Sequence, residues 1–175
     1  MSVFFVAVMS ANGKISRSHT AHLDWSSKAD LMWFKHITTK AGVVVMGRKT
    51  FDTLNSPLPG RLNVVMSHKS NRQEIPNVLF TNMPPKLLVK MLKEKGFEDI
   101  AVVGGQSVFT LFLKEKLVDE MYLTYEPIII GGIDFFSNLE EDVKMKVINT
   151  KSLDSGALVV HYKIVSWEKR YGREV

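Results

Sequence analysis

The chain has 175 residues, 45% of them hydrophobic and 23% charged, a composition that suits one domain with a buried core. It contains no cysteine, which excludes disulfides, thiolate metal ligands and a cysteine nucleophile. The five histidines lack the spacing of paired ligands, so we expect no metal. The formal net charge of +5 comes from scattered lysines and arginines, which favours small anionic ligands over nucleic acid, although a merely basic surface would look the same.

The first elements in chain order are a strand, a long loop and a helix. Val3 to Met9 is an apolar run too short to span a membrane and without a basic leader, so we expect a buried strand in a cytoplasmic protein. Residues 10–24 form a polar loop with Asn12-Gly13 as a turn. A helix is predicted from Ser26 to Lys40, with Ser26 or Ser27 as its cap.

The rest of the chain alternates strands with helices. Strands are predicted at 43–46, 62–66, 78–80, 100–103 and 120–127, and helices at 48–54, 84–95 and 106–116. The alternation predicts a single α/β domain over residues 1–175, with a mostly parallel central sheet of about eight strands and helices on both faces. The last two β-like runs, 144–153 and 158–165, should form an antiparallel hairpin.

One carboxylate on the apolar side of the first predicted helix poses the functional question. Asp30 shares a helical stripe with Leu31, Phe34 and Thr38. If Asp30 were buried without a cation, its pKa would rise, which yields a proton donor or a group that binds a cationic heterocycle. Alternatively, Asp30 points to solvent and interacts with the helix dipole.

Three further segments lie where open α/β sheets bind ligands, after the carboxyl ends of strands. MGRKTFDTL, residues 46–54, puts two cations at a helix start, which suits phosphate. SPLPGR, residues 56–61, presents an arginine rigidly enough to hold a carboxylate. VVGGQSVF, residues 102–109, lets a ligand approach the backbone, although it is not the GxGxxG fingerprint. Singly, each also suits an ordinary turn; with no GxSxG elbow, proton and hydride chemistry remains.

Taken in order, these segments resemble dihydrofolate reductase. The family's Trp five positions before a helical acid, followed by L-x-x-F and Thr, is reproduced by Trp25, Asp30, Leu31, Phe34 and Thr38. VVVMGRKTFDTLNSPLPGRLNVVMS matches the family nearly residue for residue, and VVGGQSVFTLFL and MYLTYEP match its later segments. The resemblance runs from the first strand to about residue 136 and implies the dihydrofolate reductase-like fold.

The resemblance also implies an activity: NADPH-dependent reduction of 7,8-dihydrofolate to tetrahydrofolate, by hydride transfer to C6 and protonation at N5. The implied catalytic residues are Asp30, Trp25, Leu23 and Thr124. The implied substrate-binding residues are Phe5, Val6, Ala7, Asp30, Leu31, Phe34, Leu54, Arg61, Val103 and Thr124. The implied NADPH-binding residues are Ala7, Gly47, Arg48, Lys49, Thr50, Ser67, His68, Val103, Gly104, Gly105, Gln106, Ser107, Val108 and Phe109.

Within these sets the resemblance implies particular roles. Thr124 would hydrogen-bond to Asp30, and Arg61 would bind the α-carboxylate of the substrate. Leu31, Phe34 and Leu54 would sandwich the pterin and benzoyl rings. Ser67 and His68 would lie near the adenosine 2′-phosphate, and the Gly104–Gly105 peptide bond is commonly cis in the family.

The sequence departs from the family pattern in several places. The loop 10–24 is longer and more polar than usual, so the family pattern does not define how it closes over the site. Asp24 replaces the usual Pro, and Phe109 stands where many members have Tyr. Ser107 occupies a place where some members have an Arg, so NADPH selectivity would depend on other cations nearby.

An alternative lies in the riboflavin-pathway reductases, which share the fold and NADPH but reduce a ribosylaminopyrimidine. SANGKIS and LVDEMYLTYEPIIIGG resemble segments of that group. Asp30, Phe34 and Arg61 favour a glutamylated pterin instead, and the acid and cations disfavour a non-catalytic binding protein. We expect a small-molecule partner, no nucleic acid and no membrane; monomer and homodimer both remain open.

Overall fold

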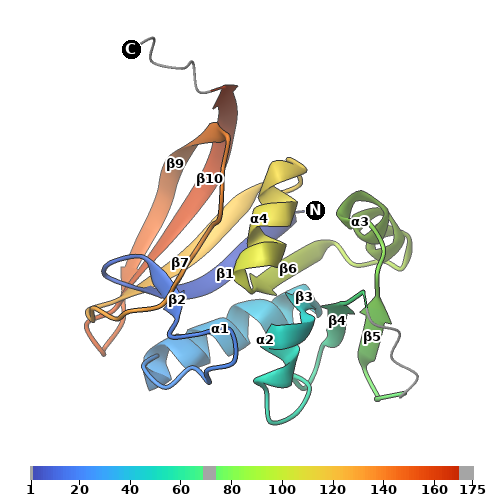
Figure 1. The fold of residues 1–175 in the computed structure, drawn as a ribbon, viewed down its shortest axis with the longest axis horizontal. Coiled ribbons are helices and arrows are strands. Elements are labelled where there is room, and N and C mark those ends of the chain that lie inside the picture. Colours follow the sequence, from blue (N-terminus) through green and yellow to red (C-terminus); the bar gives the residue numbers. More distant parts are fainter. Residues whose placement is uncertain (1, 69–73, 170–175) are drawn as a thin grey trace.

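The structure, a computed structural model, describes residues 2–68 and 74–169, and one large sheet forms its centre (Figure 1). The strands of the large sheet are β1 (Ser2–Ser10), β3 (Val43–Gly47), β4 (Leu62–Met66), β5 (Val78–Thr81), β6 (Asp99–Gly104), β7 (Glu120–Glu126), β9 (Glu141–Ser152) and β10 (Leu158–Lys169). The helices are α1 (Lys28–Ala41), α2 (Arg48–Asp52), α3 (Pro85–Glu94) and α4 (Gln106–Lys114).

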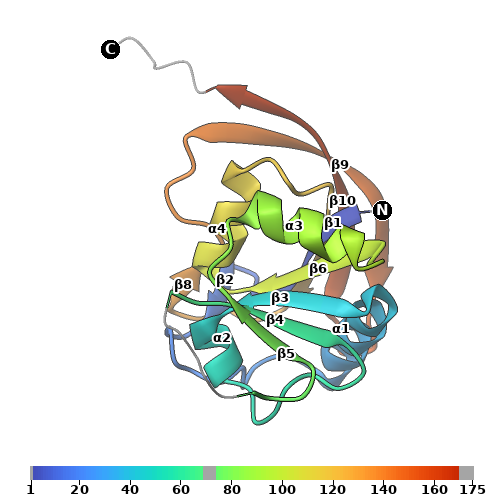
Figure 2. The ribbon, with the colours of Figure 1, turned by 90° about the vertical axis from the view of Figure 1, so that its right-hand side faces the viewer.

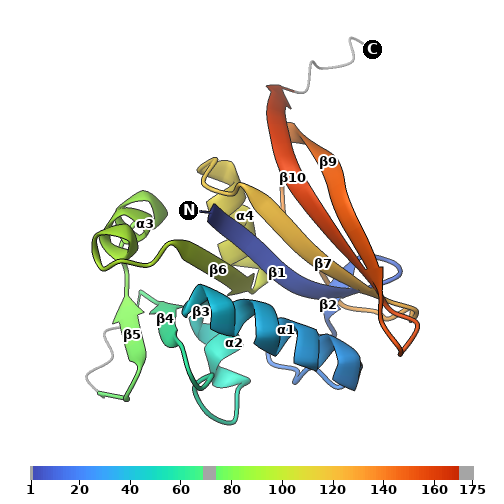
Figure 3. The ribbon, with the colours of Figure 1, turned by 180° about the vertical axis from the view of Figure 1, so that it is seen from behind.

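The eight strands follow the order β5-β4-β3-β6-β1-β7-β10-β9. Neighbouring strands from β5 to β7 are parallel, because helices or long connections carry the chain back between them. β10 pairs antiparallel with both β7 and β9, and the β9–β10 hairpin extends along one end of the sheet (Figure 3). The predicted mostly parallel sheet with a C-terminal antiparallel hairpin is confirmed.

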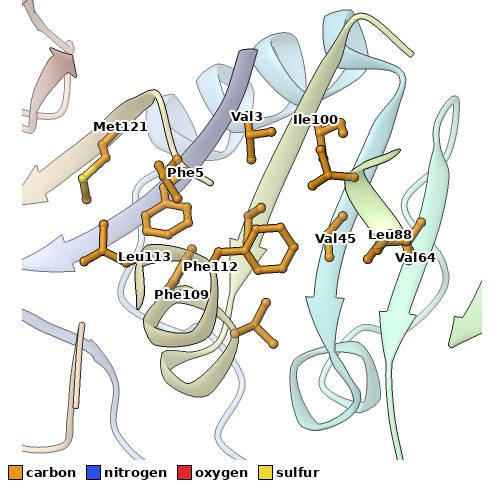
Figure 4. Close-up of a cluster of buried hydrophobic side chains, with 14 of the residues drawn as sticks. Val3, Phe5, Val45, Val64, Leu88, Ile100, Phe109, Phe112, Leu113 and Met121 are labelled. Atoms are coloured by element: carbon orange, nitrogen blue, oxygen red, sulfur yellow. The ribbon is translucent and has the colours of Figure 1, made fainter. Parts of the chain in front are cut away.

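Helices cover both faces of the sheet, as predicted (Figure 2). Successive residues of a strand point to opposite faces, so β1 buries Val3 and Phe5 on one face and Phe4 and Val6 on the other. The first face packs against α3 and α4, where Phe5 lies among the buried side chains of Figure 4. The second face packs against α1 and α2. No helix in the described part of the chain could span a membrane.

Capping residues set both ends of the first helix. Ser27 has an extended backbone, and its side chain accepts a hydrogen bond from the backbone N–H of Asp30 at 3.2 Å, which decides between the two predicted caps. The helix ends at Gly42, whose φ of 73° is in the left-handed region that closes helices. The α1 helix therefore starts with Asp30 in its first turn.

A second, two-stranded sheet was not predicted. β2 (Lys14–Ser16) pairs with β8 (Ile133–Asp134), and Lys14 Nζ lies 2.6 Å from Asp134 Oδ1. A Cβ on Gly132 would lie 2.0 Å from the backbone oxygen of Ser16, so only glycine fits there. The loop 10–24 is thus partly ordered by a segment far along the chain, and strands this short leave no periodic signal.

Candidate active site

A large cleft of about 1800 Å³ opens at the carboxyl ends of β3, β4 and β6. The loop 10–24, α1 and the amino ends of α2 and α4 form its walls. Sites for one drug-sized molecule are usually about 300–1,000 Å³, so this cleft has room for two organic ligands side by side. Its position at the strand ends agrees with the edge that the parallel topology predicts.

Most of the predicted site residues come together in this cleft. From the substrate-binding and catalytic sets, the residues that line it are Val6, Ala7, Leu23, Asp30, Leu31, Phe34, Leu54, Arg61 and Val103. The whole predicted cofactor set lines it too: Ala7, Gly47, Arg48, Lys49, Thr50, Ser67, His68, Val103, Gly104, Gly105, Gln106, Ser107, Val108 and Phe109.

The side chain of Phe5 does not reach the cleft, contrary to the prediction. It is fully buried under α4 and packs against Phe109, with ring centroids 4.9 Å apart, and against Phe135. The reason is strand alternation: Val6 points to the cleft side, so its neighbour Phe5 must point to the opposite face. Phe5 contributes to the core that supports the site.

Trp25 and Thr124 lie outside the cleft lining as well. Thr124, on β7, is buried, and its side chain lies near enough to Asp30 to oppose the rise in the pKa of that carboxyl group. The indole N–H of Trp25 is buried and has no hydrogen-bond partner among the described residues. Thr124 therefore contacts the acid from behind, on the side away from a ligand.

Asp30 is the buried acid of the site. Its side chain is 4% exposed, and Ser26 donates a hydrogen bond from its hydroxyl to Oδ2 at 2.6 Å. Burial raises the pKa of Asp30 above its ordinary value, the hydrogen bonds from Ser26 and Thr124 oppose this, and the charge of Glu126 adds to the rise. No cation pairs with Asp30 in the described part of the chain. The alternative of a solvent-exposed acid is wrong.

Arg61 is the buried cation of the site. It is 5% exposed, and its Nε donates to the backbone oxygen of Pro59 at 3.0 Å while Nη1 donates to the hydroxyl of Thr38. Burial lowers the pKa of Arg61 from its ordinary value. Within residues 2–68 and 74–169 it forms no ion pair, so a charge held in one geometry stays available for an anionic ligand group.

The amino ends of α2 and α4 meet along the other side of the cleft. Gly47 and Gly105 precede these helices, and neither provides a side-chain cap for the first N–H groups. A Cβ on Gly105 would lie 3.1 Å from Thr50 Oγ1, and one on Gly47 would lie 3.1 Å from Val108 Cγ2. Two helix starts packed this closely present backbone amides suited to phosphates. The Gly104–Gly105 bond is cis, as implied.

The cations beside these helix starts differ in how they are held. Arg48 pairs with Asp52 at 2.7 Å and lies over the ring of Phe80, whereas Lys49 is exposed and forms no ion pair with the described residues. His68 is also exposed at the cleft edge. In the described part of the chain, no group of three acidic or histidine side chains could hold a metal ion.

Sequence reasoning missed two features of the site. His22, in the loop 10–24, lines the cleft and donates from Nδ1 to the backbone oxygen of Thr53 at 2.8 Å, which joins the loop to the end of α2. Glu126 is buried behind Asp30. The signal for Glu126 was present, because it stands two residues after Thr124 in a strand and so shares its face.

Comparison with known proteins gives the relatives of this chain. Residues 2–147 match the family model described as dihydrofolate reductase. A "Putative dihydrofolate reductase" of Caenorhabditis elegans is 30% identical over 162 residues, which cover 85% of this chain and 79% of the relative. The dihydrofolate reductase of Haemophilus influenzae is 30% identical over 139 residues, 79% of this chain and 81% of the relative.

A solved structure from Shewanella sp. PV-4, described as a "Putative riboflavin biosynthesis protein", has a TM-score of 0.76 to this chain. The alignment covers 95% of this chain and 100% of the other, at 22% sequence identity. At that level of identity, the likeness establishes a common fold.

Proposed function

The chain belongs to the dihydrofolate reductase family, and on this premise we propose that it reduces 7,8-dihydrofolate to 5,6,7,8-tetrahydrofolate with NADPH. Membership makes it an oxidoreductase, and enzymes of the family use NADPH. The observation that carries the proposed substrate is a buried acid and a buried cation in one cleft, Asp30 and Arg61. Dihydrofolate has a proton-accepting pterin at one end and a glutamate carboxylate at the other, and so matches both.

The residues around the starts of α2 and α4 fit NADPH. The backbone amides at 47–50 and 104–108 would hold its phosphates, with Arg48 and Lys49 beside them. Ser67 and His68 would bind near the adenosine 2′-phosphate. When bound, NADPH supplies the hydride that reduces the pterin ring.

The residues around Asp30 would hold the pterin and supply its proton. The Asp30 carboxyl binds the amino group and adjacent ring nitrogen of the pterin. Because its pKa is raised, it favours the protonated substrate near neutral pH, which prepares protonation at N5. Leu31, Phe34 and Leu54 pack against the rings, and with Val6 they exclude water from the reacting atoms. Arg61 binds the α-carboxylate and sets how far the substrate enters.

A second candidate is reduction of a ribosylaminopyrimidine. It is favoured by the additional cationic and imidazole groups of the cleft wall, Lys35, His19 and His22, which suit a ribose phosphate as well as a carboxylate tail. The structural relative from Shewanella, by its description, belongs to riboflavin biosynthesis. The buried acid is harder to explain on this candidate, because a ribosylaminopyrimidine has no pterin ring to hold beside it.

The test follows the absorbance of NADPH at 340 nm with each substrate in turn. With dihydrofolate we expect consumption that falls about a hundredfold or more in Asp30→Asn at pH 7. Asp154→Asn, in the exposed turn between β9 and β10, is the matched control and should leave the rate unchanged. Consumption only with a ribosylaminopyrimidine would overturn the proposal. A rate with dihydrofolate that Asp30→Asn leaves unchanged would refute the role of the acid.

A further inference from the structure

A second carboxylate is buried directly behind the acid of the site. Glu126 is the last residue of β7 and is 5% exposed. Alternation along β7 places its side chain on the same face as that of Thr124, the face that packs against α1. On the neighbouring strand it lies beside Ser10, which is fully buried. Glu126 thus stands between the sheet and the start of α1, outside the cleft lining.

The contacts of Glu126 lead to Asp30 through the helix cap. Its Oε1 accepts a hydrogen bond from the backbone N–H of Ser27 at 2.8 Å. The side-chain oxygen of Ser27 in turn accepts a hydrogen bond from the backbone N–H of Asp30. The hydroxyl of Ser26 donates a hydrogen bond to the Asp30 carboxyl group at 2.6 Å. A buried carboxylate at a helix amino end also interacts favourably with the helix dipole. Glu126 therefore holds Ser27, the cap of α1, and through that cap the first turn that carries Asp30.

Neither carboxyl group of this pair is neutralised by a cation among the described residues. No ion pair joins Asp30 or Glu126 to a cation in residues 2–68 and 74–169. The lysines of α1 on either side of Asp30, Lys28 and Lys35, are exposed and also form no ion pair with described residues. From β7, Glu126 is the charged group acting on Asp30, and Thr124 acts only through a hydrogen bond. A like charge disfavours ionisation of a neighbouring acid.

We propose that Glu126 is the positioning residue of this site: it anchors the first turn of α1 through Ser27 and places a second negative charge behind the Asp30 carboxyl group. The proposal rests on the proposed function, because it assigns Glu126 a part in delivering the proton for pterin reduction. Burial and Glu126 together keep Asp30 protonated to a higher pH than burial alone would.

Two substitutions separate the anchoring effect from the charge effect. Glu126→Gln keeps an oxygen that accepts the Ser27 N–H and removes the charge, whereas Glu126→Ala removes both. Glu120→Gln is the matched control: it makes the same change earlier on β7, where the carboxylate contacts His161 and Tyr122 away from the cleft. Because Gln preserves the hydrogen bond, the Glu126→Gln protein should fold even if the Ala protein does not.

The first readout is the titration of the Asp30 carboxyl carbon by NMR in the protein without ligands, with Asp30→Asn to assign the signal. In Glu126→Gln we expect the midpoint to move to lower pH by about half to one unit, because a like charge has gone. In Glu120→Gln it should stay in place. An unchanged midpoint in Glu126→Gln would overturn the proposal, whatever happens to activity.

The second readout is the pH dependence of kcat/KM for dihydrofolate. In Glu126→Gln the fall in rate toward high pH should begin earlier, giving about a three- to tenfold loss above the midpoint and little loss below it. Glu126→Ala should lower kcat/KM at every pH. Glu126→Gln should keep kcat/KM near the wild-type value at low pH. An equal loss at every pH in both variants would reduce Glu126 to a helix anchor and refute its charge effect.

The two readouts also separate this inference from the proposed function. If the wild type reduces no dihydrofolate at any pH, the proposed substrate is wrong, and the carboxyl titration still decides whether Glu126 acts on Asp30.

Discussion

The two sides of the cleft offer a ligand different kinds of contact. On the α1 side, ligand groups would meet side chains that the fold has removed from water, Asp30 and Arg61, each fixed by hydrogen bonds to neighbours. On the side formed by α2 and α4, they would meet backbone amides and glycines, with cations that are more exposed. The first side depends on the cost of burying charge, and the second on how closely two helix starts pack. Substitutions should therefore act electrostatically on one side and sterically on the other.

The largest effect is expected at Asp30, and it should separate activity from stability. Asp30→Asn should lower kcat at pH 7 by about a hundredfold or more. The same change should raise the melting temperature at pH 7 by about 2–5 °C, because Asn removes the cost of ionising a buried carboxyl group. A melting temperature that falls along with activity would show that Asp30 stabilises the fold. It would contradict the electrostatic account of the α1 side.

The sign of the pH effect on stability follows from the raised pKa of Asp30. The folded protein holds the proton of the Asp30 carboxyl group more tightly than the unfolded chain does. The contribution of this group to stability is therefore full below its ordinary pKa of 3.8. It is lost as the pH rises through the higher, folded-state pKa. Melting curves of wild type and Asp30→Asn should thus converge at low pH and separate toward neutrality. Asp154→Asn should follow the wild type throughout.

The next largest effect is expected at Arg61. Arg61→Leu should raise KM for dihydrofolate about ten- to a hundredfold, because a desolvated cation for the carboxylate is lost, while kcat changes little. The KM for NADPH should stay constant, since Arg61 is on the α1 side. Steady-state kinetics with each substrate varied would check this. An equal rise in both KM values would mean that the two sides are not independent.

A smaller, steric effect is expected at Gly105. In Gly105→Ala the added Cβ would lie 3.1 Å from Thr50 Oγ1, so the starts of α2 and α4 must move apart. We expect weaker NADPH binding by about tenfold and a loss of about 1–2 kcal/mol in the free energy of unfolding. Gly131→Ala is the control, because a Cβ there meets nothing within 4 Å and its backbone is not left-handed. Calorimetric titration with NADPH and denaturant melts give both quantities; unchanged binding would contradict the steric account.

The smallest effect is expected at His22, which joins the loop 10–24 to α2. His22→Ala removes the hydrogen bond to the Thr53 oxygen, a contact exposed to water, so kcat/KM should fall only about two- to fivefold. The comparison is His19→Ala, which changes an exposed histidine of the same loop that makes no hydrogen bond to α2 among the described residues. Equal effects of the two changes would show that the contact with Thr53 contributes nothing.

The fold was largely predictable because most of its helices and strands are long enough to show a periodic pattern of apolar residues. β4 has the predicted bounds, and the boundaries of β1 and α4 differ from prediction by a few residues at most. β2 and β8 were missed because their pairing joins short segments that are far apart in the chain. Their stability comes from tertiary contacts, which no local pattern contains.

For the site, the local pattern left alternatives open. The helical stripe allowed Asp30 to be buried or exposed, the resemblance to dihydrofolate reductase favoured a buried acid, and the structure buries it. Phe5 was wrong because strand alternation was not applied to separate it from Val6. Glu126 was missed because it acts on Asp30 and not directly on a ligand. That effect depends on how β7 packs against the start of α1.

The pairing of β2 with β8 has a consequence for the entropy of ligand binding. Ordering a backbone costs about 1–2 kcal/mol of conformational entropy per residue, and three residues of the loop 10–24 are already ordered by a partner strand. A ligand entering the cleft would have fewer residues to immobilise, so more of its contact energy would appear as affinity. Gly132, which lets the two segments approach because it has no Cβ, would thus favour binding without touching the ligand.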